Sequence, residues 1–278
     1  MPEISESLVR DLEERARQLR IMSLEMIHRR GAGHPGGSLS CAEIMAALFF
    51  HHLRLDPQRP DWPARDRFIL SKGHAAAVLY AALALRGFFP PADLARWGEL
   101  DCHLQGHPDR LKTPGVEMTS GLLGHGIAIG VGLALSLRLR ASSARVVTLL
   151  GDGECQGGIV WEGAMAARKF RLARLTAILD ANDVQLDGAV HDIMPLEPVV
   201  DKWRAFGWAV VEVNGHDVRQ VLTALATAEQ IHDRPTMIVA RTTKGRGVSF
   251  MENDARWHGV APNADQLAAA LAELQGGA

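Results

Sequence analysis

The stretch RVVTLLGDGE, residues 145–154, joins a short apolar run to a glycine-rich turn that carries two carboxylates. Three similar apolar runs follow it, at Leu175–Asp180, Trp208–Val213 and Thr236–Ala240. Continuous apolar runs of this length are typical of strands that are covered on both faces. Helical patterns at 157–170 and 217–231 separate three of the runs, and strand–helix–strand order implies right-handed crossovers. The pattern predicts an α/β fold with a doubly wound, mainly parallel sheet and helices on both faces.

Outside these runs the sequence shows mainly helical periodicity. Apolar residues within 6–30 form one helical stripe, with Ser5 or Ser7 as its N-cap. A second helix is expected over Ser40–His52, where Ser40 and Glu43 have the spacing of a capping box. Further helices are expected at 75–85, at 91–97, at 122–140 and at 263–275, the last with Asn263 as its cap.

The composition argues against several classes of protein. Thirty Lys+Arg and 32 Asp+Glu give a net charge of -2, whereas sequence-independent nucleic-acid binding normally needs a basic excess. No apolar run approaches the roughly 18–20 residues that span a bilayer, and no signal peptide is recognisable. Cys41, Cys102 and Cys155 are too scattered for a disulfide framework or a zinc ribbon. We therefore expect a single domain over residues 1–278, located in the cytoplasm, with no nucleic acid and no membrane as a partner.

Two polar residues at the ends of neighbouring predicted strands indicate a metal site. Asp152 follows one strand and Asn182 follows the next, thirty residues later, which corresponds to one strand–helix–strand crossover. Adjacent parallel strands would place both side chains at the carboxyl edge of the sheet, where α/β proteins bind ligands. Mg²⁺ prefers one or two carboxylates together with phosphate oxygens, and the helix N-terminus after Gly153 suits a phosphate. A simple turn at Asp152 and a strand-end cap at Asn182 are the alternative.

An ordered set of motifs resembles the thiamine diphosphate enzymes, and within them the N-terminal half of transketolase. The G-D-G turn at 151–153, followed by Asn182, matches the diphosphate-binding motif of that family. The other matching stretches extend over almost the whole chain: Gly33–Ser38 (GHPGGS), Leu70–His74 (LSKGH), Gly106–Pro108 (GHP), Thr113–Met118 (TPGVEM), Gly121–Gly124 (GLLG), Asp201–Trp203 (DKW), Lys244–Glu252 (KGRGVSFME) and Trp257–Gly259 (WHG). The resemblance is strongest to the stand-alone N-terminal subunit of two-subunit transketolases.

The resemblance implies a thiamine diphosphate-binding fold of the diphosphate type and assigns roles to individual residues. The metal, Mg²⁺ with Ca²⁺ or Mn²⁺ as substitutes, would be held by Asp152, Asn182 and the main-chain carbonyl of Val184. The cofactor-binding residues would be His74, Gly121, Leu122, Leu123, Asp152, Gly153, Glu154, Asn182 and His258. The catalytic residues would be His34, His74, His107 and His258. Imidazoles suit this role because near neutral pH they can donate hydrogen bonds to a developing oxyanion or shuttle protons.

Three positions depart from the family pattern. Gly157 stands where the family commonly has a glutamate of an acidic cluster, which puts communication between two active sites in doubt. His125 stands where glutamine is frequent and Leu122 where proline or serine is common, and both lie beside the cofactor turn. Six histidines outside the motifs are interpreted as surface or packing residues: His28, His51, His52, His191, His216 and His232.

The resemblance also implies a partner chain. In this family a pyrimidine-type domain supplies the glutamate that activates the aminopyrimidine, and with a C-terminal domain it binds the sugar phosphate. We expect both domains on a C-terminal transketolase subunit, most simply in an α₂β₂ assembly, with the sugar-selecting residues on that partner. The expected function is the transfer of a two-carbon ketol unit from a ketose (phosphate) to an aldose (phosphate), by a transferase active only with its partner. The alternatives are a transketolase-like subunit for a non-standard sugar, a subunit of a 2-oxo acid decarboxylating enzyme, or a non-catalytic cofactor-binding subunit.

Overall fold

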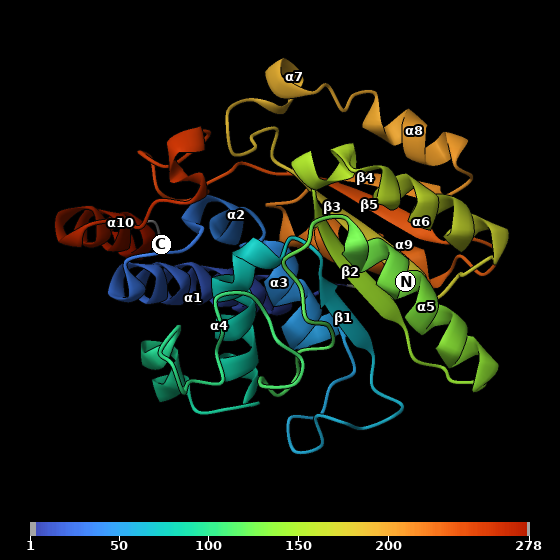
Figure 1. Cartoon of the computed structure of the whole chain (residues 1–278), viewed down its shortest axis with the longest axis horizontal. Helices are drawn as coiled ribbons and strands as arrows, with labels where there is room; N and C mark the ends of the chain where they lie inside the picture. The colour runs from blue at the N-terminus through green and yellow to red at the C-terminus, as the bar shows by residue number, and fades with distance from the viewer. Residues whose placement is uncertain (1–3, 277–278) are drawn as a thin grey trace.

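The sheet has five strands, all parallel, in the order β1-β2-β3-β5-β4 (Figure 1). A computed structural model describes residues 4–276 of the chain. The strands are β1 (Arg67–Leu70), β2 (Val146–Gly151), β3 (Leu175–Ala181), β4 (Ala209–Asn214) and β5 (Thr236–Arg241). Four of them confirm the predicted apolar runs to within one residue at each end. The sequence did not identify β1 as a strand, because its four residues are too few to show a period.

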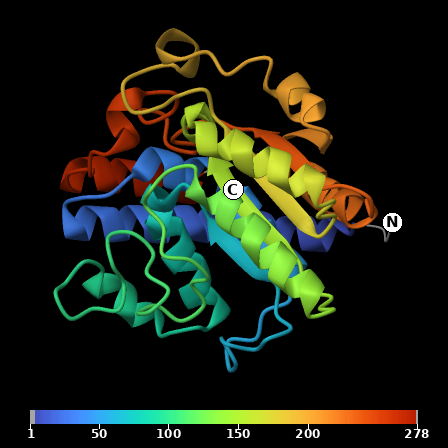
Figure 2. The same cartoon turned by 45° about the vertical axis from the view of Figure 1, so that its right-hand side comes forward.

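Helices cover both faces of the sheet, which confirms the predicted fold class (Figure 2). One layer consists of α1 (Glu6–Arg30), α3 (Ala42–Ala47), α4 (Ala76–Arg86) and α9 (Val218–Glu229). The other layer consists of α5 (His125–Leu139), α6 (Gly158–Lys169) and α8 (Val199–Ala205). In β2, Val147 and Leu149 pack into the first layer while Val146 and Leu150 pack into the second. Burial on both faces explains why the runs of β2, β3 and β5 are continuously apolar rather than alternating.

The region between residues 35 and 52 is not the single helix expected there. It forms α2 (Pro35–Ser40), then α3, then a π-helical turn, η1 (Leu48–His52). The Ser40 hydroxyl donates to the buried Asp180 carboxylate at 2.6 Å, and the Glu43 carboxylate accepts from Arg20 at 2.6 Å. The capping-box prediction is wrong because both side chains have buried tertiary partners, which sequence spacing cannot reveal.

Other helix boundaries follow local backbone rules. The N-cap predictions are confirmed: the Ser5 hydroxyl accepts from the N–H of Leu8 at 3.2 Å, and Asn263 caps α10 (Ala264–Gly276) by accepting from Gln266 at 2.9 Å. The helix expected from residue 122 begins only at His125, because Gly121 and Gly124 have φ values of 138° and 82° and form a turn instead. The remaining short elements are η2 (Gly73–Ala75), η3 (Pro91–Arg96), η4 (Gly153–Gln156), α7 (Val190–Ile193) and η5 (Ala255–His258).

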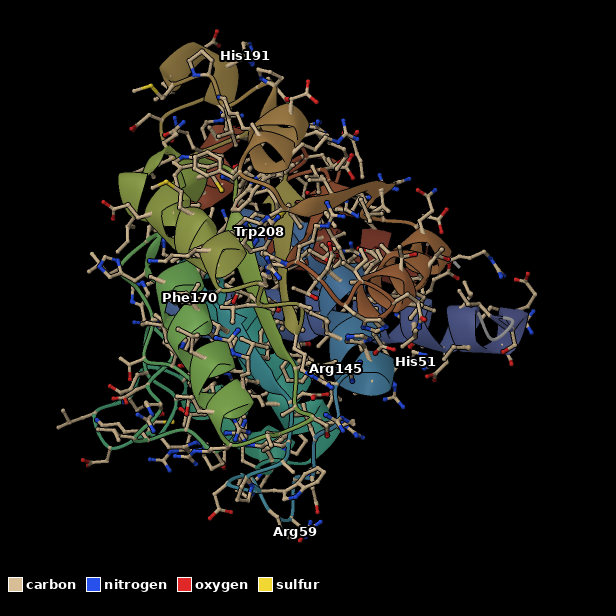
Figure 3. The ribbon with its side chains drawn as sticks, turned by 90° about the vertical axis from the view of Figure 1, so that its right-hand side faces the viewer. His51, Arg59, Arg145, Phe170, His191 and Trp208 are labelled. Atoms are coloured by element: carbon tan, nitrogen blue, oxygen red, sulfur yellow. The ribbon has the colours of Figure 1, made fainter. Side chains whose placement is uncertain are left out.

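The register of the sheet positions the candidate site. Gly151 of β2 pairs with Asp180 of β3, so the residues that follow each strand lie beside each other at the carboxyl edge. Figure 3 shows the two edges: Arg145 precedes β2 at one, and His191, in the segment after β3, lies at the opposite one. Among the helices of residues 4–276, none combines the length and the apolarity that a membrane crossing requires.

Candidate active site

Three of the four predicted catalytic histidines form one cluster. His34 is the residue before α2, His74 lies in η2 and His258 ends η5. Their ring centroids are 5.1 Å apart for His34 and His74, 5.4 Å for His34 and His258, and 5.1 Å for His74 and His258. Three motifs that are distant in the sequence therefore place their imidazoles together.

Burial and neighbouring cations hold this cluster in the neutral form. Burial, assisted by the positive charge of Lys72, lowers the pKa of His74 well below its ordinary value. Burial and the charge of Lys244 lower the pKa of His258 to about 3. The Lys244 ammonium lies 2.8 Å from Nδ1 of His258 and can only donate, so Nδ1 accepts and Nε2 carries the proton. His258 can therefore present an N–H donor to a ligand at neutral pH.

The three predicted metal ligands lie together after β2 and β3. The buried Asp152 carboxylate accepts the N–H groups of Gly153 at 2.7 Å and Asp183 at 2.6 Å, which join the two strand ends. The side-chain oxygen of Asn182 accepts from the N–H of Val184 at 3.2 Å. Carboxylate, amide and carbonyl oxygens are the hard donors that Mg²⁺ takes in proteins. The predicted proximity of Asp152 and Asn182 is confirmed.

Lys244 is a site residue to which the sequence reasoning gave no role. Its ammonium donates to the carbonyl of Val184 at 2.8 Å, so a cationic group already lies at that predicted metal ligand. Burial lowers the pKa of Lys244 to about 8, against the opposing effect of the Asp152 charge. A methyl group on Gly36 would lie 2.9 Å from two side-chain carbons of Lys244, so a larger residue at position 36 would clash with the lysine side chain. The sequence feature that could have indicated a site role for Lys244 is its position just beyond β5, the strand that pairs with β3.

The predicted cofactor turn, residues 121–123, lies on the exposed side of the site. Leu122 is 68% exposed and Leu123 is 46% exposed. A methyl group on Gly73 would lie 2.5 Å from the Ser120 hydroxyl and 2.7 Å from the Gly121 nitrogen, so the loop before η2 touches this turn directly. His107, the fourth predicted histidine, is exposed and lies against Gly121 rather than in ring contact with the cluster.

Glu154, predicted to bind the cofactor, is turned into the protein. Its carboxylate accepts from the Ser71 hydroxyl, from the N–H of Gly124 at 2.7 Å and from the N–H of Gly151 at 3.0 Å. Both oxygens are thus occupied by protein donors, and the side chain is buried. Glu154 therefore joins the predicted cofactor turn to the end of β2 and fixes the position of these two segments.

The orientation of Asn182 is fixed by a buried polar cluster beneath the site. Its side-chain nitrogen donates to the Asp180 carboxylate at 3.1 Å. That carboxylate also accepts from Lys72 at 2.5 Å, from Ser40 and from Thr242. Because the nitrogen of Asn182 donates to Asp180, its oxygen is the atom that accepts from the N–H of Val184. Lys72 belongs to the Ser-Lys-Gly-His motif, but its buried role was not predicted.

Within residues 4–276, no three His, Cys, Asp or Glu side chains come together as a metal site. The predicted magnesium site is of another kind, with one protein carboxylate and further oxygens from phosphate. None of the three positions that depart from the family pattern is a predicted metal ligand. His125 hydrogen-bonds the Leu123 carbonyl at 3.2 Å, and Gly157 is the N-cap of α6.

Hard oxygen donors and a lysine lie at the carboxyl edge of the parallel sheet, near neutral histidines, and such a set suits a divalent cation bound together with an anionic ligand. Comparison with known families agrees, since the family model described as "Transketolase, thiamine diphosphate binding domain" matches residues 12–275. The chain belongs to the transketolase family and is a transferase component of that family's N-terminal type.

Similar proteins include stand-alone subunits of nearly the same length. The chain is 43% identical over 265 residues to a 6-deoxy-6-sulfo-D-fructose transketolase subunit from Clostridium sp. (strain MSTE9), and the match covers 95% of this chain and 96% of the relative. It is 37% identical over 266 residues to one subunit of an apulose-4-phosphate transketolase from Phocaeicola vulgatus, with coverage of 96% and 94%. The resemblance to stand-alone N-terminal subunits is confirmed.

Among solved structures, a transketolase from Leishmania mexicana is similar with a TM-score of 0.92 and 32% identity. A transketolase from Campylobacter jejuni is similar with a TM-score of 0.91 and the same identity. The matches cover 95% and 96% of this chain but only 41% and 43% of those longer chains. The chain therefore corresponds in fold to one part of a full-length transketolase.

Proposed function

We propose that this chain binds thiamine diphosphate through Mg²⁺ and, with a partner subunit, transfers a two-carbon ketol unit from a ketose to an aldose. The observation that carries the proposal is the meeting of Asp152, Asn182 and Lys244 at the carboxyl edge, beside the cluster of His34, His74 and His258. Thiamine diphosphate, when bound, supplies the carbanion that attacks the ketose carbonyl.

The residues that follow β2, β3 and β5 would divide the opposite charges of Mg²⁺ and the diphosphate between them. Asp152, Asn182 and the carbonyl of Val184 would hold Mg²⁺, while the N–H of Gly153 and the Lys244 ammonium would meet the diphosphate. Lys244 now donates to Val184, so metal binding there requires it to change partner, and a diphosphate offers one of opposite charge. This set of residues suits a ligand in which a divalent cation and an anion lie side by side.

The histidines act as hydrogen-bond donors and acceptors on the substrate. His258 is held with Nδ1 toward Lys244, which leaves its Nε2–H for the substrate oxygen that gains negative charge. Burial also lowers the pKa of His34, so it enters the reaction as a neutral imidazole. His107, on the exposed side of Gly121, is placed to contact the more distant part of a sugar.

A partner chain explains the apolar surface beside the cofactor turn. Leu122, Leu123, Ile129 of α5 and Met165 of α6 are all 40% exposed or more, and α5 and α6 lie next to each other (Figure 1). Side chains of this kind normally lose exposure to a partner when they are grouped. The proposed partner carries the pyrimidine-type and C-terminal domains, in an α₂β₂ assembly, and completes the cofactor site. The names of the similar proteins, which describe them as subunits, support this arrangement.

The first candidate substrate class is a ketose phosphate with an aldose phosphate acceptor. A non-standard sugar is the second candidate, because two similar proteins are named for 6-deoxy-6-sulfo-D-fructose and apulose-4-phosphate. The alternative of a non-catalytic cofactor-binding subunit is disfavoured because the three histidines and Lys244 lie in contact with one another.

Calorimetric titration of the purified chain with thiamine diphosphate and Mg²⁺ tests the cofactor site. Asp152→Asn should weaken binding at least tenfold, since it removes the only carboxylate of the proposed metal ligand set. Asp187→Asn, an exposed residue of the loop that follows β3, is the control and should bind like the wild type. Unchanged cofactor affinity in Asp152→Asn would overturn the assignment. The chain mixed with its partner should transfer ketol units from one or more of a panel of ketose donors, a reaction that neither protein shows alone.

A further inference from the structure

Arg30, the last residue of α1, lies in a slot made by three segments. Its guanidinium carbon is 4.5 Å from the ring centroid of Trp97, and it stacks there as a cation on an aromatic face. A methyl group on Gly98 would lie 2.6 Å from Nε of Arg30, and one on Gly106 would lie 2.9 Å from Nη2. Both glycines are therefore needed for the guanidinium to occupy this place. Gly106 directly precedes His107, so the slot borders the predicted substrate histidines.

The platform under Arg30 is rigid. The indole N–H of Trp97 donates to the carbonyl of Gln105 at 2.8 Å, and the hydroxyl of Tyr80 donates to the same carbonyl at 2.8 Å. The N–H of Gly98 donates to the carbonyl of Leu104 at 3.1 Å, which closes the loop between η3 and the Gly-His-Pro motif. A side chain stacked on such a platform loses little further entropy when it binds a ligand.

The charge of Arg30 has no neutralising partner. Within residues 4–276 its guanidinium makes no hydrogen bond or ion pair, and the residue is exposed, so its N–H donors are available. The same charge helps to lower the pKa of His34, after burial, His107 and Lys244, which places Arg30 within electrostatic range of the cluster. The helix dipole does not account for this arrangement, because Arg29 shares the last turn of α1 without such a slot.

We propose that Arg30 is a specificity-determining residue that binds the anionic terminal group, a phosphate or a sulfonate, of a sugar whose reacting end lies at the histidine cluster. The inference rests on the proposed ketol transfer and names the substrate class for that same site. It revises the expectation that all sugar-selecting residues lie on the partner: this chain supplies one itself. A planar guanidinium with parallel N–H groups matches tetrahedral oxyanions in two-point contacts.

Steady-state kinetics of the assembled two-subunit enzyme test the inference. With one ketose donor held fixed, the acceptors are D-erythrose, D-erythrose 4-phosphate and 4-deoxy-4-sulfo-D-erythrose, which share one carbon skeleton and differ in terminal charge. Arg30→Gln should lower kcat/KM for an anionic acceptor about tenfold, mainly through KM, while kcat/KM for D-erythrose changes less than about twofold. The phosphate and sulfonate arms show which anion the slot selects. Arg29→Gln, the neighbouring exposed arginine, should leave all three values unchanged.

Equal losses of kcat/KM for neutral and anionic acceptors in Arg30→Gln, or no loss for either anion, would overturn the proposal and leave Arg30 a structural residue. If the assembly transfers no ketol unit to any acceptor, the proposed function fails, and the anion slot is then decided by binding to the isolated chain. Line broadening of the ³¹P signal of D-erythrose 4-phosphate should be greater with the wild type and Arg29→Gln than with Arg30→Gln. Identical broadening by all three proteins would reject the slot independently of the reaction.

Discussion

The ammonium of Lys72 and the carboxylate of Asp180 form a buried ion pair at 2.5 Å beneath the candidate active site. The two residues come from the segment after β1 and from β3, and the burial of both is nearly complete. Lys72 also donates to the carbonyl of Gly37 at 2.7 Å, so it connects three segments of the site. A buried pair of this kind is costly to break, because removal of one partner leaves an uncompensated charge.

Lys72→Met should therefore reduce the free energy of unfolding by about 3–5 kcal/mol. Urea denaturation followed by circular dichroism measures this loss. The double variant Lys72→Met with Asp180→Asn removes both charges and should recover a large part of the loss. A decrease below about 1 kcal/mol in the single variant would contradict the buried ion pair.

The pKa of Glu43 predicts how stability depends on acidity. Burial acts to raise this pKa, but the charge of Arg20 and hydrogen bonds from His216 and Arg20 overcome it and hold the pKa at about 2, against an ordinary value of 4.5. Since the folded pKa is the lower one, the stabilisation is complete above pH 4.5 and is lost as the pH falls from 4.5 toward 2.

Glu43→Gln should thus flatten the acid limb of the stability curve. Between pH 4.5 and 2, the free energy of unfolding should fall less steeply in the variant, by up to about 1.4 kcal/mol per pH unit. Urea denaturation at a series of pH values measures the slope. Glu25→Gln, an exposed position of α1, serves as the control and should keep the wild-type slope. Parallel acid limbs for Glu43→Gln and wild type would reject the linkage.

The sequence predicted the sheet from its apolar runs, and it predicted part of the site from the crossover that relates Asp152 to Asn182. The same reasoning could not predict contacts between side chains that are distant in the sequence. The Lys72–Asp180 pair joins residues 108 positions apart, and no local pattern indicates it. Glu43 shows the same limit, since its spacing from Ser40 suggested a helix cap while its carboxylate binds Arg20 and His216. The stacking of Arg30 on Trp97 likewise depends on how the end of α1 packs against the residues that follow η3.

The exposed apolar residues of α5 and α6 predict where the partner binds. Met165→Asp and Ile129→Asp should each weaken assembly with the proposed partner about tenfold or more, because a charge would be buried in the interface. Analytical ultracentrifugation of the mixed subunits measures the change. The unfolding free energy of the isolated variants should stay within about 0.5 kcal/mol of the wild type, since both positions are exposed.

Leu139→Asp provides the matched control for this surface. Leu139 is 85% exposed at the far end of α5 from the cofactor turn, outside the proposed interface. Its substitution should leave assembly unchanged. Assembly that is equally sensitive at Leu139 and at Met165, or insensitive at both Ile129 and Met165, would place the partner elsewhere on the molecule.

Gly73 and Gly132 predict opposite outcomes for the same chemical change. A methyl group on Gly73 would meet the Ser120 hydroxyl at 2.5 Å and the Gly121 nitrogen at 2.7 Å, so Gly73→Ala must displace the cofactor turn. We expect a loss of about 1–3 kcal/mol in unfolding free energy and weaker binding of thiamine diphosphate in a calorimetric titration. A methyl group on Gly132, within α5, would meet no atom within 4 Å, so Gly132→Ala should stabilise the chain by up to about 1 kcal/mol. Equal cofactor affinity in both variants would show that the contact between residue 73 and the 121–123 turn does not shape the cofactor site.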